Sequence, residues 1–223
     1  MRNFFNLESP IMIFFSNLTD VIILNILCLV CSIPIVTIGP SVTALHYVTL
    51  KMVKDEEVYV LKYFFKSFKE NLKQSIIAWV IFLVITITFL LDYRIIKSVG
   101  MEENKILFSI IGAIYLLICL FTMYIFPLLA RFENTLIQTV KNAVFMSILH
   151  IFRTVIMAVI YVVPAFLISK HYNFIMVYLL VGIAGPAYIN SFFWRSIFKK
   201  YEPQEIKEEI TADEDFHVIV EET

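Results

Sequence analysis

Residues 76–91 read IIAWVIFLVITITFLL, a run of 16 residues without a charge. Residues 72–75 extend the run at its start, and it ends at three charged residues, Asp92, Arg94 and Lys97. Lys73 is the one charged residue among residues 72–91, and a mostly apolar run of about 20 residues is long enough to cross the hydrocarbon core as a helix. Trp79 lies near its beginning, where membrane helices often carry interfacial aromatic residues. The stretch therefore predicts a transmembrane α-helix.

Three more runs of this kind follow in the chain. Residues 106–130 contain no charge and predict a helix of about 37 Å, with an expected kink at Pro127 near its end. Residues 154–169 predict the next crossing, which contains Pro164. Residues 174–193 predict a crossing that is interrupted at Gly185-Pro186. Together these runs indicate an all-α, polytopic transmembrane bundle of five or six membrane helices.

The first hydrophobic region, residues 11–50, carries Asp20 as its only charge. Pro34 and Pro40 predict a break over residues 33–40, followed by a new helix from Ser41 to Val53. That second helix is short for a crossing, so a half-crossing and a complete span are both open. The N-terminus lies outside the cell if residues 11–50 cross once, and inside if they cross twice.

A basic amphipathic stretch follows at residues 51–73. Its apolar side chains fall on one helical face, formed by Leu61, Phe64, Phe65, Phe68 and Leu72. Beside them lie four lysines, Lys62, Lys66, Lys69 and Lys73. The pattern favours a helix in the membrane surface, although a solvated helix packed on its own protein would look similar. The lysines of residues 51–73 predict that this stretch lies on the cytoplasmic side. Residues 135–149 are a second amphipathic candidate.

The composition agrees with a membrane protein, because 60% of the residues are hydrophobic and only 17% are charged. We expect a single transmembrane domain over residues 1–200. Residues 201–223 predict an acidic, mostly disordered cytoplasmic tail, with a short strand-like or partner-binding end as the alternative. The C-terminus is expected to be cytoplasmic because a basic cluster precedes it, formed by Arg195, Lys199 and Lys200. Glu8 and Pro10 argue against a cleavable signal peptide.

Motifs for catalysis are not found in the sequence. Cys28, Cys31 and Cys119 lie in apolar runs and are expected to be packing residues, although the first two form a C-x-x-C. The four histidines are scattered and have no ligand spacing. There is no nucleophile elbow, phosphate loop or dinucleotide fingerprint. We therefore expect no enzyme activity, no cofactor, no metal and, with a net charge of −1, no nucleic-acid partner.

Polar, glycine and proline residues in the apolar runs are the candidate functional positions. The candidates are Asp20, Asn25, Thr37, Gly39, Pro40, Pro127, Arg131, Gly185 and Pro186. Such residues either bridge helices or line a pathway. For the amphipathic helix the candidates are Lys62, Phe65, Lys66, Phe68, Lys69 and Lys73, facing the membrane surface. Gly39-Pro40 and Gly185-Pro186 also suggest a weak internal repeat.

Three stretches resemble the YesL family of bacterial membrane proteins, which has a domain of unknown function. They are residues 34–40 with Asp20 and Asn25 before them, residues 64–71, and residues 126–133 with Lys141-Asn142-Ala143 after them. The resemblance implies a multi-pass protein of the bacterial plasma membrane. It also implies genes that often neighbour those of carbohydrate uptake and degradation, and no established reaction.

Two function classes follow from these observations. The first is an accessory protein of carbohydrate uptake or utilisation, embedded in the lipid bilayer and touching ABC sugar transporter subunits through its cytoplasmic helices. The second is an independent small-solute carrier for sugars, with a site between the helices broken at Pro40 and Pro186. An intramembrane enzyme is disfavoured, and a structural or signalling role is open. The sequence does not indicate the oligomeric state.

Overall fold

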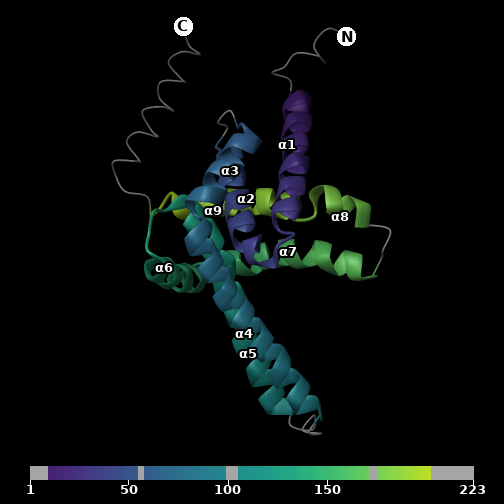
Figure 1. The fold of residues 1–223 in the computed structure, drawn as a ribbon, viewed down its shortest axis with the longest axis vertical. Coiled ribbons are helices and arrows are strands. Elements are labelled where there is room, and N and C mark those ends of the chain that lie inside the picture. Colours follow the sequence, from purple (N-terminus) through teal and green to yellow (C-terminus); the bar gives the residue numbers. More distant parts are fainter. Residues whose placement is uncertain (1–9, 55–57, 99–104, 171–174, 202–223) are drawn as a thin grey trace.

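The computed structural model describes residues 10–54, 58–98, 105–170 and 175–201, and these residues form helices without any strand (Figure 1). In chain order the elements are α1 (Pro10–Cys31), η1 (Ile35–Thr37), α2 (Ile38–Met52), α3 (Val60–Glu70), α4 (Leu72–Ser98), α5 (Lys105–Arg131), α6 (Leu136–Leu149), α7 (Ile151–Lys170), α8 (Ile175–Val181) and α9 (Ala184–Phe198). The predicted all-α class is confirmed. The predicted acidic tail lies outside the described residues.

Several helices expose apolar side chains that a protein in water would bury. Among the described residues, α1, α4 and α5 are long and apolar enough to cross a membrane, and the number rises to five if each of two bent pairs is one span. On α4 the exposed fractions of Ile81, Val84 and Leu90 are 52%, 56% and 53%. Apolar surface on this scale requires a lipid environment. The chain is therefore a membrane-embedded helical protein. The upper count of five spans equals the lower of the expected numbers, which were five and six membrane helices.

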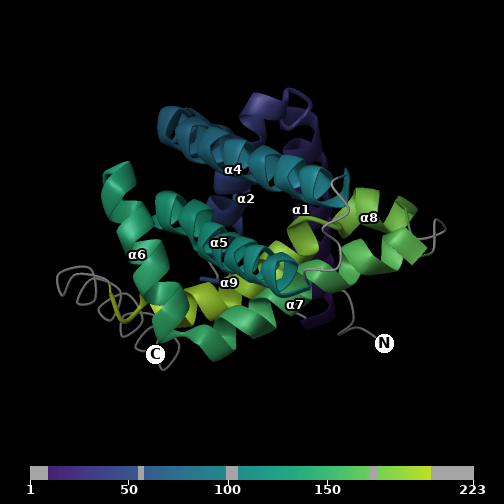
Figure 2. The same cartoon turned by 90° about the horizontal axis from the view of Figure 1, so that it is seen from below.

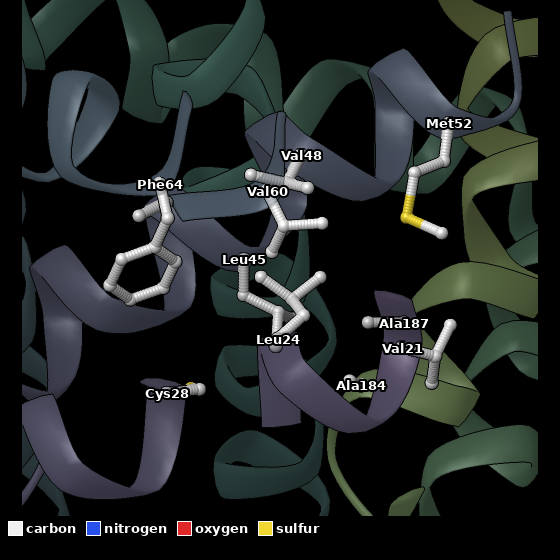
Figure 3. Close-up of a cluster of buried hydrophobic side chains, with 11 residues drawn as sticks. Val21, Leu24, Cys28, Leu45, Val48, Met52, Val60, Phe64, Ala184 and Ala187 are labelled. Atoms are coloured by element: carbon white, nitrogen blue, oxygen red, sulfur yellow. The ribbon is translucent and has the colours of Figure 1, made fainter. Parts of the chain in front are cut away.

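Helix α2 forms the centre of the molecule (Figure 1). It packs against α1, α3, α4, α5 and α9, and most of its side chains are buried. Its Leu45 and Val48 pack with Leu24 of α1, Phe64 of α3 and Ala187 of α9 in one apolar cluster (Figure 3). A helix of 15 residues is about 22 Å long, which is less than the hydrocarbon thickness. The half-crossing alternative for residues 38–52 is consistent with this length.

A second apolar cluster joins the C-terminal half of the chain to α2. Leu50 of α2 packs there with Tyr124 and Leu128 of α5, Met157 of α7 and Trp194 of α9. The Tyr124 and Trp194 rings meet edge to face at 4.5 Å between centroids, a favourable aromatic geometry. Both clusters thus use α2 and α9, which each carry a Gly-Pro pair in the first turn.

Two helical hairpins extend from this centre. Helices α4 and α5 run side by side over their length, and α7 runs beside α8 (Figures 1 and 2). In Figure 1 the α4–α5 pair extends downward and the α7–α8 pair extends to the right, while α6 lies on the left in both views (Figures 1 and 2). Helix α6 meets α7 at 100°, so α6 crosses the direction of α7 and does not continue it.

The boundaries correct three expectations. Helix α2 begins at Ile38 and not at Ser41, because proline is tolerated in the first turn, where no N–H partner is needed. The break in the last hydrophobic run lies at residues 182–183, and Gly185-Pro186 belongs to the first turn of α9 for the same reason. Helix α4 continues through the charged residues after Leu91 and ends at Ser98.

Candidate functional site

Asn25 of α1 closes the break between α8 and α9. Its amide oxygen accepts hydrogen bonds from the backbone N–H groups of Ile183 and Ala184, both at 2.9 Å. Its amide nitrogen donates to the backbone oxygens of Leu179 at 2.8 Å and Tyr178 at 3.4 Å. Asn25 is fully buried, so one side chain satisfies the end of α8 and the start of α9 at once. This predicted site residue bridges helices.

Hydroxyl groups tie α2 to its neighbours along its length. The Thr43 and Ser75 hydroxyls share a hydrogen bond of 2.8 Å between α2 and α4. One turn and a half later, Ser191 of α9 donates to the Thr49 hydroxyl at 2.8 Å. All four side chains are buried. Because buried polar groups need partners, these pairs fix the register of α2 against both helices.

A guanidinium group stabilises the end of α2. Arg195 of α9 donates to the backbone oxygen of Val53 at 2.6 Å, directly after the last helical residue of α2. A cation at a helix C-terminus also interacts favourably with the helix dipole. Helix α9 therefore holds α2 at two places, Thr49 and Val53.

A cluster of polar side chains lies where α2, α7 and α9 meet. The Tyr161 hydroxyl of α7 is 3.5 Å from His46 Nε2, and Asn190 of α9 donates to the backbone oxygen of Met157 at 3.2 Å. His46 Nδ1 and Asn190 Oδ1 are buried and have no hydrogen-bond partner within the part of the chain that the structure describes. Buried unpaired polar atoms are rare and often mark a functional position. His46 and Asn190 are both among the polar residues that the sequence places at membrane depth, but local patterns could not bring them together, because 144 positions separate them.

Gly39 allows α2 and α4 to cross closely. A Cβ atom at Gly39 would overlap the backbone oxygen of Ser75 and would lie 2.8 Å from Trp79 Cβ. The Trp79 indole in turn donates to the backbone oxygen of Ile35 at 2.8 Å. Pro40 is buried beside Gly39. Residues 39–40 of the predicted candidate stretch are therefore closely packed against α4.

The remaining candidates do not converge on one place. The Thr37 hydroxyl donates within the break, 2.6 Å from the backbone oxygen of Cys31 and 2.8 Å from that of Pro34. Pro127 is buried inside α5, and Arg131 is the half-buried last residue of that helix. Asp20 is partly exposed on α1. The described residues contain no group of three or more side chains suited to a metal ion.

At the α8–α9 break, Gly182 is the residue that sterics require. A Cβ atom there would overlap the Tyr178 side chain and would lie 2.6 Å from its backbone oxygen. At Gly185 the added atom would make an ordinary contact of 3.7 Å with Val181. Pro186 is buried in the first turn of α9. Gly182, which was not among the predicted candidates, is thus the more tightly packed of the two glycines.

The amphipathic helix α3 divides its residues between the protein and the surroundings. Phe64 and Ser67 are fully buried against the rest of the protein, whereas Leu61 and Phe65 are 57% and 43% exposed. Three lysines, Lys62, Lys66 and Lys69, are exposed as well. Phe68 is partly buried, and Lys73 is exposed at the start of α4. Packing on the protein and an exposed basic and aromatic face therefore coexist on one helix.

Comparison with known proteins adds one family. Residues 21–93 are similar to the family described as "Protein of unknown function, DUF624". The matched stretch runs from the middle of α1 into α4, and it includes Asn25, the Gly39-Pro40 turn and all of α3. No curated protein and no solved structure matches the chain.

Proposed function

We propose that this chain is a membrane-embedded accessory protein of carbohydrate uptake, which presents short basic helices to a partner at the cytoplasmic face of the bacterial plasma membrane. The observation that carries the proposal is the exposed face of α3. Lys62, Lys66 and Lys69 stand there beside exposed Leu61 and Phe65, while the opposite face is buried on α2. The helix is thus firmly attached and still offers a free surface.

Helix α6 supports the same role. It carries exposed apolar side chains on a short helix that crosses the direction of α7, with Ile137, Phe145 and Ile148 exposed by 70%, 60% and 62%. A capping box at Thr135 and Gln138 fixes its start. Short helices with apolar anchors and flanking charges are suited to a membrane surface or to a partner's groove. Positive charge near the ends of membrane spans favours a cytoplasmic position for α3, for α6 and for the end of α9.

The link to carbohydrate comes from the resemblance to the YesL family, and the partner class that follows is a subunit of an ABC sugar transporter. Non-enzymatic action fits the same reading, because the buried threonine hydroxyls Thr43 and Thr49 of α2 are engaged with other helices. Thr43 meets Ser75 and Thr49 meets Ser191, which leaves these hydroxyls no free reactive position.

Co-purification from native membranes in a mild detergent tests the proposal. We expect the tagged wild-type chain to recover transporter subunits, and a Lys62→Glu, Lys66→Glu, Lys69→Glu variant to lose them. The control is Arg94→Glu with Lys97→Glu, near the end of α4 that is far from α3. Failure of the wild type to recover any transporter subunit would contradict the proposal, as would equal recovery by the two charge-reversed variants.

An independent sugar carrier is the second candidate, favoured by the unpaired His46 Nδ1 and Asn190 Oδ1 between α2 and α9. Polar groups at membrane depth between broken helices are typical of transporter sites. Proteoliposomes containing only this chain distinguish the two candidates. Uptake of a sugar that is lost in His46→Ala would favour the carrier, and proteoliposomes that take up none of a panel of sugars would favour the accessory protein.

A further inference from the structure

A groove of about 550 Å³ lies between α7 and the broken pair α8–α9. One wall is the stretch of α7 from Val159 to Leu167, and the other includes Val177, Gly185 and Ile189. The groove exists because α8 and α9 are bent by 47° and because Gly182 and Gly185 place no side chain in it. It is separate from the basic surface of α3.

The lining of this groove suits hydrocarbon and not water. The side chains around it carry no charge, and Val163, Val177 and Ile189 are exposed by 47%, 54% and 50% on its flanks. Water does not fill apolar cavities, and an empty one forfeits the dispersion contacts of its walls. For a groove that opens sideways from membrane helices, the surrounding medium is lipid acyl chain.

A positive charge continues the α7 wall of the groove. Val163, Leu167 and Lys170 follow one another at spacings of four and three residues, so they share one face of the helix. Lys170 is exposed at the end of α7, and its ammonium group lies 5.9 Å from the centroid of the Phe166 ring. That distance is at the outer limit of a cation–π contact, so the ammonium is available to a stronger partner. A lysine at the end of a membrane helix commonly reaches the phosphate layer.

We propose that this groove is a binding site for an anionic phospholipid, with one acyl chain between α7 and α8–α9 and its phosphate at Lys170. The apolar lining selects the chain, and the lysine selects the negatively charged headgroup. A bound lipid would complete the packing that the bend between α8 and α9 leaves open. The site is independent of the proposed accessory role, since no residue of α3 or α6 contributes to it.

Native mass spectrometry tests the site on the full chain, released from nanodiscs that contain equal amounts of phosphatidylglycerol and phosphatidylcholine. We expect the wild type to retain one phosphatidylglycerol. Gly185→Leu should reduce the lipid-bound fraction at least fivefold, because its side chain would extend into the groove without a backbone clash. The control is Gly112→Leu on α5, where a Cβ atom meets nothing within 4 Å.

Two further variants keep the test decisive. Val163→Trp fills the groove from the opposite wall and should lose the lipid even if Gly185→Leu fails to fold. Lys170→Ala should keep a bound lipid and abolish the preference for phosphatidylglycerol. The proposal is overturned if filled-groove variants that retain the wild-type circular dichroism also retain lipid. It is also overturned if Val163→Trp converts a dimer to a monomer without lipid loss, because a second copy would then occupy the groove.

Discussion

The side-chain oxygen of Asn25 accepts a hydrogen bond from the backbone N–H of Ala184, 159 residues later in the chain, at 2.9 Å. This contact joins α1, the first helix of the fold, to the first residue of α9. A broken helix in a membrane needs a partner for each backbone group it frees, since lipid offers none. Asn25 supplies both the acceptor and the donors.

Replacing Asn25 should therefore destabilise the C-terminal half of the bundle. In Asn25→Ala the partly buried N–H group of Ile183 and the buried N–H group of Ala184 lose their acceptor, which should lower the free energy of unfolding by about 2 kcal/mol. Thermal unfolding in detergent measures the change. Asn17→Ala, two turns earlier on the partly exposed part of α1, is the control and should change little. Equal melting temperatures for the two variants would contradict the role of Asn25.

Two glycines provide a matched test of helix packing. Gly39→Ala should lower the free energy of unfolding by about 1–3 kcal/mol, because its Cβ overlaps the Ser75 backbone oxygen and forces α2 from α4. Gly112→Ala should stabilise by about 0.5 kcal/mol, since alanine is the better helix former and the site is open. Both are measured by the same unfolding titration. A tolerated Gly39→Ala would mean that the two helices do not cross this closely.

The hydroxyl pair between α2 and α9 should show energetic coupling. A double-mutant cycle with Thr49→Val and Ser191→Ala should give an interaction energy of about 0.5–1 kcal/mol, the range of hydrogen bonds between membrane helices. The control cycle combines Ser191→Ala with Thr88→Val, whose hydroxyl donates within α4. That cycle should be additive within error. Additivity in both cycles would show that the 2.8 Å contact contributes nothing to stability.

The turn between α1 and α2 should lie in hydrocarbon. Ile33, Ile35 and Val36 are exposed there by 77%, 63% and 51%, which water would penalise. In a chain with its native cysteines replaced, Ile35→Cys should resist a membrane-impermeant maleimide from both sides. Lys66→Cys should react from the cytoplasmic side and Ser98→Cys from the outside. Labelling of Ile35→Cys from outside would instead indicate two complete crossings in residues 11–53.

The long apolar runs made the membrane helices predictable. Residues 76–91 and 106–130 needed only length and the absence of charge, and α4 and α5 contain them entirely. The proline break before α2 was also predictable, because proline restricts the residue before it. The predicted helix start at Ser41 was wrong. Proline disrupts the interior of a helix, but it is tolerated in the first turn, where Pro40 lies.

The contacts at the centre could not be derived from one sequence. Asn25 was a candidate because it is polar within an apolar run, yet its partners at residues 178–184 are set by tertiary packing. His46, Tyr161 and Asn190 lie on three helices, and local periodicity cannot place them together. The pattern of α3 predicted one apolar face, which the structure divides, because Phe64 is buried while Leu61 and Phe65 are exposed. It did not indicate that Ser67, a small polar residue, would be buried in place of Leu61.

The central position of α2 has a consequence for biogenesis. Its polar side chains Thr43, His46 and Thr49 find partners at residues 75, 161 and 191, all of which the ribosome makes after α2 itself. The Thr43 and Thr49 hydroxyls meanwhile donate to backbone oxygens within α2, at Gly39 and His46, and their contacts with Ser75 and Ser191 have to wait until α4 and α9 have been made. The order of translation therefore makes the contacts with α9 the last of the described contacts of α2 that can form.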